Sequence, residues 1–572
     1  MNRKKFIELV GVGTGAVVSY SVPNFSIVNP LKADKGFDIK GFALNADLVI
    51  AGGGIGACSA ALSALRNNLS VIMTEETDWI GGQLTQQGVP PDEHPWIETH
   101  GATALYRSFR NGVREFYKTN YPLTEGARAE KYLNPGDGAV SELCHEPKVS
   151  LAVVQSMLSP YLSSGKLTLL LEHKIVSADV TGSKVRALKA VSKRSGRELV
   201  LSGQYFADAT ELGDLLPLTG TELVTGTESK KETGELHAPE VGDPNNHQAF
   251  TVCFAMDYIA GANHTIDKPA EYTFWNNYVP KMSPAWPGKL LQLMYPKPAT
   301  LVPTPLGFHP EGVETGKSLN LWKYRRIISK DNFREGSYTG DVSSINWPQN
   351  DYTLGNLIGA SEKQFNYHVG RAKQLSLSLL YWLQTEAPRP NGGYGWPGLR
   401  LRKDMMGTED GLAKYPYIRE ARRIKAVFTV KEEHVGVDNR ALVYGKEAAK
   451  KSADFYDSVG VGSYHIDLHP STNGNNYIDF NSLPFQIPLG ALLPQRIDNL
   501  LPANKNIGTT HITNGCYRLH PVEWSIGEAV GLLAAYAIQN RVLPREVREK
   551  KNLLHDFQNF ITKQGVELKW PA

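Results

Sequence analysis

Two basic side chains close to the end of the chain have the chemistry of a catalytic site. Arg518 and His520 stand in the run Tyr517-Arg518-Leu519-His520-Pro521, immediately before a segment with the composition of a helix. A histidine can take up or release a proton near neutral pH, as the oxidation of an alcohol requires. A guanidinium group binds an acidic group through parallel hydrogen bonds. We therefore expect His520 to be a catalytic base, with a cofactor contact or a structural role as the alternatives. We expect Arg518 to bind substrate or cofactor, with a structural role as its alternative, and His511 is a third candidate.

Catalytic side chains need a scaffold, and the clearest scaffold signal lies near the other end of the chain. A short apolar strand runs into a glycine-rich loop, an alanine- and leucine-rich helix follows, and a second strand ends on an acidic residue. These parts are residues 47–51, Gly52-Gly53-Gly54-Ile55-Gly56-Ala57, residues 58–66, residues 70–74 and Glu75. This order within about thirty residues is the fingerprint of a dinucleotide-binding βαβ unit.

Each residue type in this loop has a physical reason. Gly52 permits the tight turn, Gly54 lets the backbone approach a pyrophosphate, and Ala57 keeps the helix close to the strand where the fingerprint prefers glycine. Gly56 belongs to the same loop, and the helix N-terminus offers free N–H groups to phosphates. Glu75 would accept hydrogen bonds from the adenosine ribose. The alternative is a glycine turn in an α/β domain that binds no nucleotide.

Three further segments accompany this unit. Residues 78–85 contain the pair Gly81-Gly82 followed by Gln83, and residues 206–214 read as a strand that ends at Asp208. Near the C-terminus, Pro521 suits the first position of a helix in which Gly527 would allow close approach to a cofactor. For Asp208 the alternative is an ordinary turn that its side chain caps.

These segments contain the motifs "IGGQLT", "DATELGD" and "YRLHPVEW". Through them, most of residues 46–540 resembles the FAD-dependent oxidoreductase family, which consists of flavoproteins of the glutathione-reductase-2 type. The resemblance implies FAD as the cofactor, with Gly52, Gly54, Gly56, Ala57, Glu75, Gly81, Gly82, Gln83, Asp208 and Gly527 around it. It also implies that the chain after Gly82 passes the isoalloxazine ring. His94 and His100 lie there, so each is a candidate catalytic base or covalent attachment point.

The expected fold class is α/β, with a discontinuous Rossmann-type FAD-binding domain and an inserted α+β substrate domain. We expect an export leader, a first FAD-binding part, a substrate or cap domain, a C-terminal return to the FAD-binding domain and a tail. Their bounds are residues 1–36, 45–220, 221–485, 486–545 and 546–572.

The middle of the chain contains polar and aromatic segments and one long amphipathic pattern, which predicts a helix over residues 362–384. Residues 346–352 permit a sugar-binding pocket wall, or ordinary packing with Trp347 in the core. Arg419, Arg422 and Arg423 have the spacing of one helix face and would form ion pairs or an anion site. His465, Asp467 and His469 alternate along the chain, but we expect hydrogen-bonding roles and no metal.

Composition excludes several classes of protein. The 572 residues carry 61 basic and 58 acidic side chains, so no charge excess indicates nucleic acid as a partner. The four cysteines show no metal-binding spacing and permit, without requiring, one disulfide. Arg3, Lys4 and Lys5 precede a mildly apolar stretch that is too short for a stable membrane span. It resembles a twin-arginine export signal and predicts a periplasmic or otherwise exported protein; the alternative is a cytoplasmic one.

These inferences together predict an exported FAD-dependent oxidoreductase. It would transfer a hydride between flavin N5 and a small polar organic substrate, carbohydrate derivatives included. No second glycine fingerprint indicates an NAD(P)H domain, so a soluble acceptor, oxygen or a quinone would take the electrons. The alternatives are a glycan-binding accessory protein on a flavoprotein scaffold and a flavin-dependent isomerase or lyase. The sequence identifies neither the substrate, the acceptor nor the oligomeric state.

Overall fold

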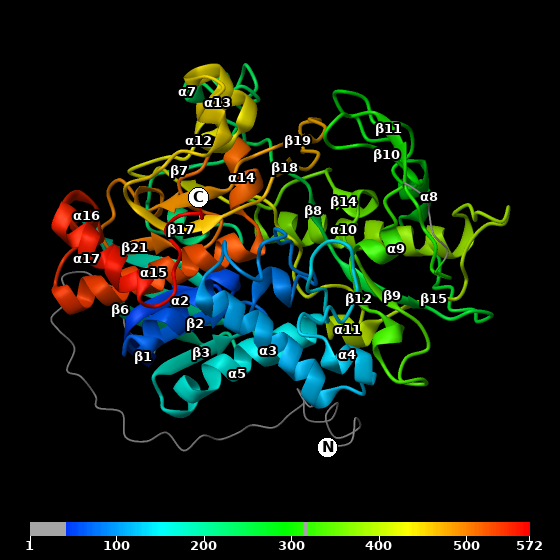
Figure 1. Cartoon of the computed structure of the whole chain (residues 1–572), viewed down its shortest axis with the longest axis horizontal. Coiled ribbons are helices and arrows are strands. Elements are labelled where there is room, and N and C mark those ends of the chain that lie inside the picture. The colour runs from blue at the N-terminus through cyan, green and yellow to red at the C-terminus, as the bar shows by residue number, and fades with distance from the viewer. Residues whose placement is uncertain (1–41, 313–317, 572) are drawn as a thin grey trace. The chain divides into compact units, whose positions relative to one another are not determined.

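A computed structural model describes residues 42–312 and 318–571 (Figure 1). The predicted leader and its export route lie outside these residues. No helix within the described ranges has the length and apolar character to cross a membrane.

The main sheet has seven strands and a parallel centre, in the order β3-β2-β1-β6. Strand β21 pairs in parallel with the last residues of β6, and β5 and β4 extend the sheet in antiparallel fashion. The strands are β1 (Phe42–Ala51), β2 (Val71–Glu75), β3 (Leu167–Leu171), β4 (His173–Thr181), β5 (Lys184–Ser192), β6 (Glu198–Asp208) and β21 (Leu500–Pro502). The expected α/β class is correct, and strands from both the N-terminal and the C-terminal parts of the described chain form this sheet.

Two helices from opposite ends of the sequence pack closely together, α2 (Ile55–Arg66) and α15 (His520–Asn540). A Cβ at Gly527 would lie 2.0 Å from the carbonyl oxygen of Gly56. The hydroxyl of Ser59 donates to the carbonyl oxygen of Trp524 at 2.8 Å. Gly527 therefore lets the two helices touch, and the cofactor contact expected of it stays a prediction.

A second, antiparallel sheet belongs to the middle of the chain, with strand order β12-β13-β9-β15. Its strands are β9 (Phe254–Tyr258), β12 (Arg326–Ile328), β13 (Val342–Ile345) and β15 (Leu399–Leu401). Helix α10 (Glu362–Thr385) lies beside them and begins with a capping box between Ser361 and Gln364. The predicted long helix is thus confirmed.

The arginine-rich segment is not the helix that its spacing suggested. Arg423 and Ile424 form strand β16, which pairs with β7 (Leu223–Val224). Arg419 and Arg423 are buried and make ion pairs with residues from distant parts of the chain. Those long-range pairs outweigh the local helical pattern, and they confirm the ion-pair interpretation.

Within residues 346–352, Trp347 packs in the core, as the alternative to a pocket wall predicted for it. Trp347 is 1% exposed and packs edge-to-face against Phe308. Asn350 accepts a hydrogen bond from the Trp347 backbone N–H at 2.8 Å. All four cysteines are buried and free.

Candidate active site

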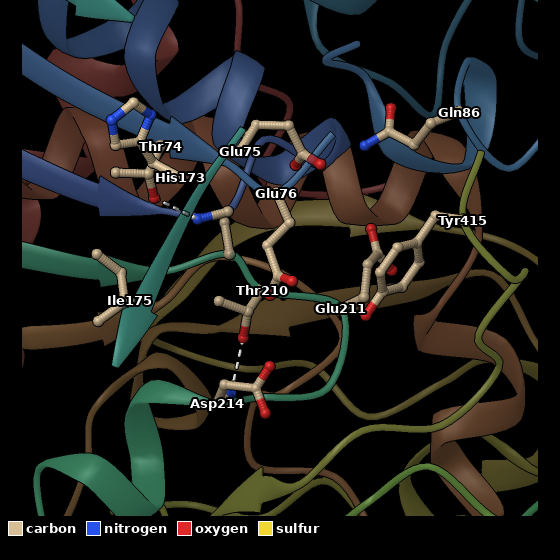
Figure 2. A pocket seen from close by; sticks show the side chains of 13 residues that line it. Thr74, Glu75, Glu76, Gln86, His173, Ile175, Thr210, Glu211, Asp214 and Tyr415 are labelled. Carbon is tan, nitrogen blue, oxygen red and sulfur yellow. Dashed lines mark hydrogen bonds between the residues drawn. The ribbon is translucent and has the colours of Figure 1, made fainter. Parts of the chain in front are cut away.

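A cavity opens where β1, β2 and β6 end, at the position where open α/β sheets bind ligands (Figure 2). Both the glycine loop and the acidic end of β2 contribute to its wall. The lining residues are Gly52, Gly54, Thr74, Glu75, Glu76, Gln86, His173, Ile175, Ala209, Thr210, Glu211, Asp214 and Tyr415.

The glycine loop has the form that a phosphate group requires. Gly52 has a φ of +91°, and a Cβ there would lie 2.3 Å from the carbonyl oxygen of Ala209. Gly54 is the N-cap of α2, and no described side chain caps that end. The N–H groups in the first turn of α2 are therefore available to an external acceptor.

Glu75 closes the loop from the end of β2. Its carboxylate accepts hydrogen bonds from the backbone N–H groups of Gly53 at 2.9 Å and Thr77 at 2.8 Å. Burial raises the pKa of Glu75 to about 7, against the lowering effect of these bonds. Hydroxyl groups of a ribose would add donors to this carboxylate and favour its charged form.

The second glycine pair packs directly on the loop. Gly81 donates its backbone N–H to the Gly53 carbonyl oxygen at 2.7 Å, and a Cβ at Gly82 would lie 3.0 Å from the Cα of Gly54. Gln83 faces away from the cavity lining and donates to the carboxylate of Glu523 at 2.7 Å. Gln83 thus connects the loop to α15.

Asp208 caps a turn, which was the alternative to the cofactor contact expected of it. Its carboxylate accepts from the Thr210 hydroxyl at 2.7 Å and from the backbone N–H of Leu215 at 3.1 Å. It is fully buried and does not line the cavity, whereas Thr210 does. Both carboxylate oxygens serve the turn, which favours the structural alternative, and the cofactor contact expected of Asp208 stays a prediction.

A buried cation beside the loop was missed by sequence reasoning. The Lys505 ammonium group lies 2.6 Å from Glu211 and 3.2 Å from Glu523. The two carboxylates raise the pKa of Lys505 to about 12, against the effect of burial. No motif surrounds Lys505 in the sequence, so only the fold reveals that it offsets negative charge next to a phosphate site.

His520 stands at the start of α15, fully buried, with its tautomer set by the backbone. The N–H of Asp92 donates to Nδ1 at 3.0 Å, so the proton of the neutral ring is on Nε2. Burial lowers the pKa of His520 to about 4. At neutral pH this ring carries a proton on Nε2, and its only lone pair, on Nδ1, accepts from the Asp92 N–H, so its geometry does not favour the predicted role as a base.

Arg518 is held by two partners and has one donor unused. It donates to the Tyr417 hydroxyl at 2.8 Å and to the Asp467 carboxylate at 3.0 Å, while its Nε finds no partner among the described residues. Asp467 also approaches His465 and Asp479, whose ligand atoms lie within 4.8 Å of one another.

The remaining histidine candidates lie away from the cavity lining. His94 contacts Trp570, with ring centroids 5.2 Å apart, and bonds to the Gly101 carbonyl oxygen at 3.1 Å. His100 stacks on Trp96 in the same aromatic cluster. His511 pairs with the buried carboxylate of Glu420 at 2.9 Å. Their catalytic roles stay predictions.

The cavity residues fit a dinucleotide. A loop that tolerates no side chain at Gly52, the uncapped end of α2 and the carboxylate of Glu75 match a pyrophosphate and its ribose. Fold and site define a dinucleotide-binding protein with a discontinuous sheet.

Comparison with known proteins identifies the cofactor and the family. The family model described as FAD dependent oxidoreductase matches residues 47–560. The chain therefore belongs to the FAD dependent oxidoreductase family, and FAD is its cofactor. Family membership favours an enzyme over the glycan-binding alternative. No curated protein matches the chain.

Solved structures show distant likenesses. Quinol fumarate reductase FrdA from E. coli is 11% identical over 91% of this chain and 74% of its own, with a TM-score of 0.32. OxyS anhydrotetracycline hydroxylase from Streptomyces rimosus is 8% identical over 91% and 68%, with a TM-score of 0.34. L-proline dehydrogenase from P. horikoshii is 15% identical with a TM-score of 0.17, and the match spans 33% of this chain and 24% of that protein.

Proposed function

We propose that the protein transfers a hydride between FAD and a small polar organic substrate. Bound FAD supplies the hydride acceptor or donor, and the chain's own residues hold, orient and shield the reactants. The glycine loop binds the pyrophosphate, Glu75 binds the ribose, and Lys505 offsets the charge. These roles follow from the contacts described above.

The observation that carries this proposal is that two residues of the cavity lining stand within two residues in the chain of members of a buried polar cluster, Gln87 and Tyr417. Gln86 and Tyr415 line the cavity, and the N–H of Tyr415 donates to the Gln86 carbonyl oxygen at 3.1 Å. Gln87 and Tyr417, one and two residues further along the chain, are buried. The side-chain amide of Gln87 has no hydrogen-bond partner among the described residues, and the Tyr417 hydroxyl accepts a hydrogen bond from Arg518. A substrate held in that cluster would lie beside the part of the cofactor that extends beyond the cavity.

Three finer features belong to the same proposal. The substrate range to be screened includes carbohydrate derivatives, and the electron acceptor is a soluble compound, oxygen or a quinone. The basic residues at positions 3–5 support export. A flavin-dependent isomerase or lyase would use the same residues. It is distinguished from an oxidoreductase by measuring whether the substrate undergoes a net oxidation or reduction.

The visible spectrum of the purified protein, before and after acid precipitation, tests the proposal. We expect oxidised flavin bands, their release into the supernatant by acid, and anaerobic bleaching by a substrate that becomes oxidised. Colour kept in the pellet would indicate covalent attachment, with His94 and His100 as the residues to replace. A colourless protein that takes up no added FAD would contradict the proposal.

A further inference from the structure

Helix α13 (Val437–Tyr444) has its apolar end on the outside of the protein. The helix buries two polar side chains, Asn439 and Arg440. In contrast, Leu442, Val443 and Tyr444, which we call the α13 tip, are 70%, 47% and 53% exposed. A surface helix normally turns its apolar residues toward the core and its charged residues toward water. Packing of the described chain on itself therefore does not account for the α13 tip.

Arg440 fixes this inverted orientation of the helix. Its side chain donates to the backbone carbonyl oxygens of Glu433 at 2.8 Å and Lys451 at 2.9 Å. Its guanidinium group also lies 5.5 Å from the centre of the Tyr444 ring. These contacts tie both α12 (Glu432–Val435) and the chain after α13 to the buried side of the helix. The exposure of the α13 tip is thus built into the fold.

Basic side chains follow the α13 tip, which projects from the body of the described chain next to α12 (Figure 1). Lys446, Lys450 and Lys451 are exposed. Lys450 pairs with Glu447 at 2.6 Å, whereas Lys446 and Lys451 form no ion pair with the described residues. The exposed acid of α13 itself, Asp438, stands at the opposite end of the helix. The surroundings of the tip therefore carry a positive excess.

The size and the chemistry of the α13 tip select its partner. Three side chains are far less than the surface of a stable protein–protein interface, which buries about 800 Å² on each partner. A lipid surface requires no such area, because a few apolar side chains can enter the boundary between headgroups and acyl chains. Tyrosine is enriched at that boundary, and lysines near it are attracted to anionic headgroups. The combination favours a lipid surface over a second copy of the chain.

We propose that the α13 tip docks on a membrane surface that contains anionic phospholipid. Leu442 and Val443 enter the boundary of the bilayer, and Tyr444 lies among the headgroups. Lys446 and Lys451 approach the lipid phosphates. The inference is independent of the FAD site, because none of these residues lines the cavity. The contact brings the protein to the phase in which a quinone acceptor would be dissolved.

Flotation of the full, FAD-loaded protein with lipid vesicles tests the proposal. The probes are vesicles of phosphatidylcholine alone and of phosphatidylcholine mixed with phosphatidylglycerol. We expect the protein to bind the mixed vesicles more tightly, and this binding should weaken as the salt concentration rises. The double variant Leu442→Glu/Val443→Glu should bind the mixed vesicles about tenfold more weakly, because charged side chains do not enter the bilayer. Lys446→Glu/Lys451→Glu should remove the preference for phosphatidylglycerol.

Tyr367→Glu is the matched control, because Tyr367 is a 58% exposed aromatic side chain on another helix, α10. It should bind vesicles as the wild type does, and thermal unfolding should confirm that every variant is folded. The proposal is wrong if the wild type does not bind the mixed vesicles, or if the Leu442→Glu/Val443→Glu variant binds them equally well. A wild-type dimer that this variant dissolves would also overturn it, because a second copy would then cover the tip. A protein without FAD would contradict the proposed function instead and would leave this test unchanged.

Discussion

Around the glycine loop, neighbouring elements touch through their backbones, whereas around Arg419 they touch through buried charges. Gly56 and Gly527 bring α2 and α15 into contact, and an added Cβ at Gly527 would meet backbone 2.0 Å away. Arg419 instead reaches Asp351 at 2.9 Å, and both side chains are at most 3% exposed. The first region tolerates no added volume, because backbone cannot move aside. The second tolerates no lost charge, because the Asp351 carboxylate would stay buried without its guanidinium partner.

The largest effect is expected from breaking the charged region. Arg419→Met should lower the free energy of unfolding by about 3–5 kcal/mol, because it leaves the Asp351 carboxylate buried beside only His469 and Thr251. Chemical denaturation measures this change. Glu447→Gln is the control, since its ion pair with Lys450 is exposed and should contribute nothing measurable. Equal effects from the two variants would remove the distinction between the regions.

A smaller effect is expected from adding volume to the backbone region. Gly527→Val should cost about 1–3 kcal/mol, because the new side chain forces α15 away from α2. Gly370→Ala is the matched control inside α10, where no atom lies within 4 Å of the added Cβ, and it should stabilise the protein by about 0.5–1 kcal/mol. Thermal unfolding of both variants is the measurement. Unchanged stability in Gly527→Val would show that the helices are not in tight contact.

The smallest effect concerns cofactor affinity. Burial raises the pKa of Glu75 to about 7, so the group is protonated below pH 7 and charged above it. The charged form accepts more hydrogen bonds from ribose, so FAD affinity should rise between pH 6 and pH 8. Glu75→Gln should weaken binding about tenfold at pH 8, or ~1.4 kcal/mol, and flatten this pH dependence. Fluorescence titration of the apoprotein with FAD measures both; a wild type whose affinity falls as pH rises would contradict the assignment.

The same contrast explains what could be predicted from the sequence. The glycine loop, the end of β2 at Glu75 and the C-terminal return depend on local backbone geometry, which leaves a pattern of glycines, strands and an acid. Lys505 carries no such pattern, because its partner Glu211 lies far away in the chain. For Gly527 and Asp208 the sequence predicts cofactor contacts, while the structure shows their roles in packing and in a turn. A glycine that allows close packing of a helix cannot be distinguished in the sequence from one that allows close approach of a ligand.

The pairing of β21 with β6 has a consequence for the order of events during synthesis. The second edge of β6 is shared, with β5 along its first residues and β21 along its last. While the ribosome translates the middle of the chain, the end of β6 and the α15-facing side of α2 have no partner. Exposed strand edges and apolar helix faces are where nascent chains aggregate or recruit chaperones. The elements that support the glycine loop are therefore complete only after residues 500–540 have emerged, so we expect FAD to bind late, after synthesis of the chain.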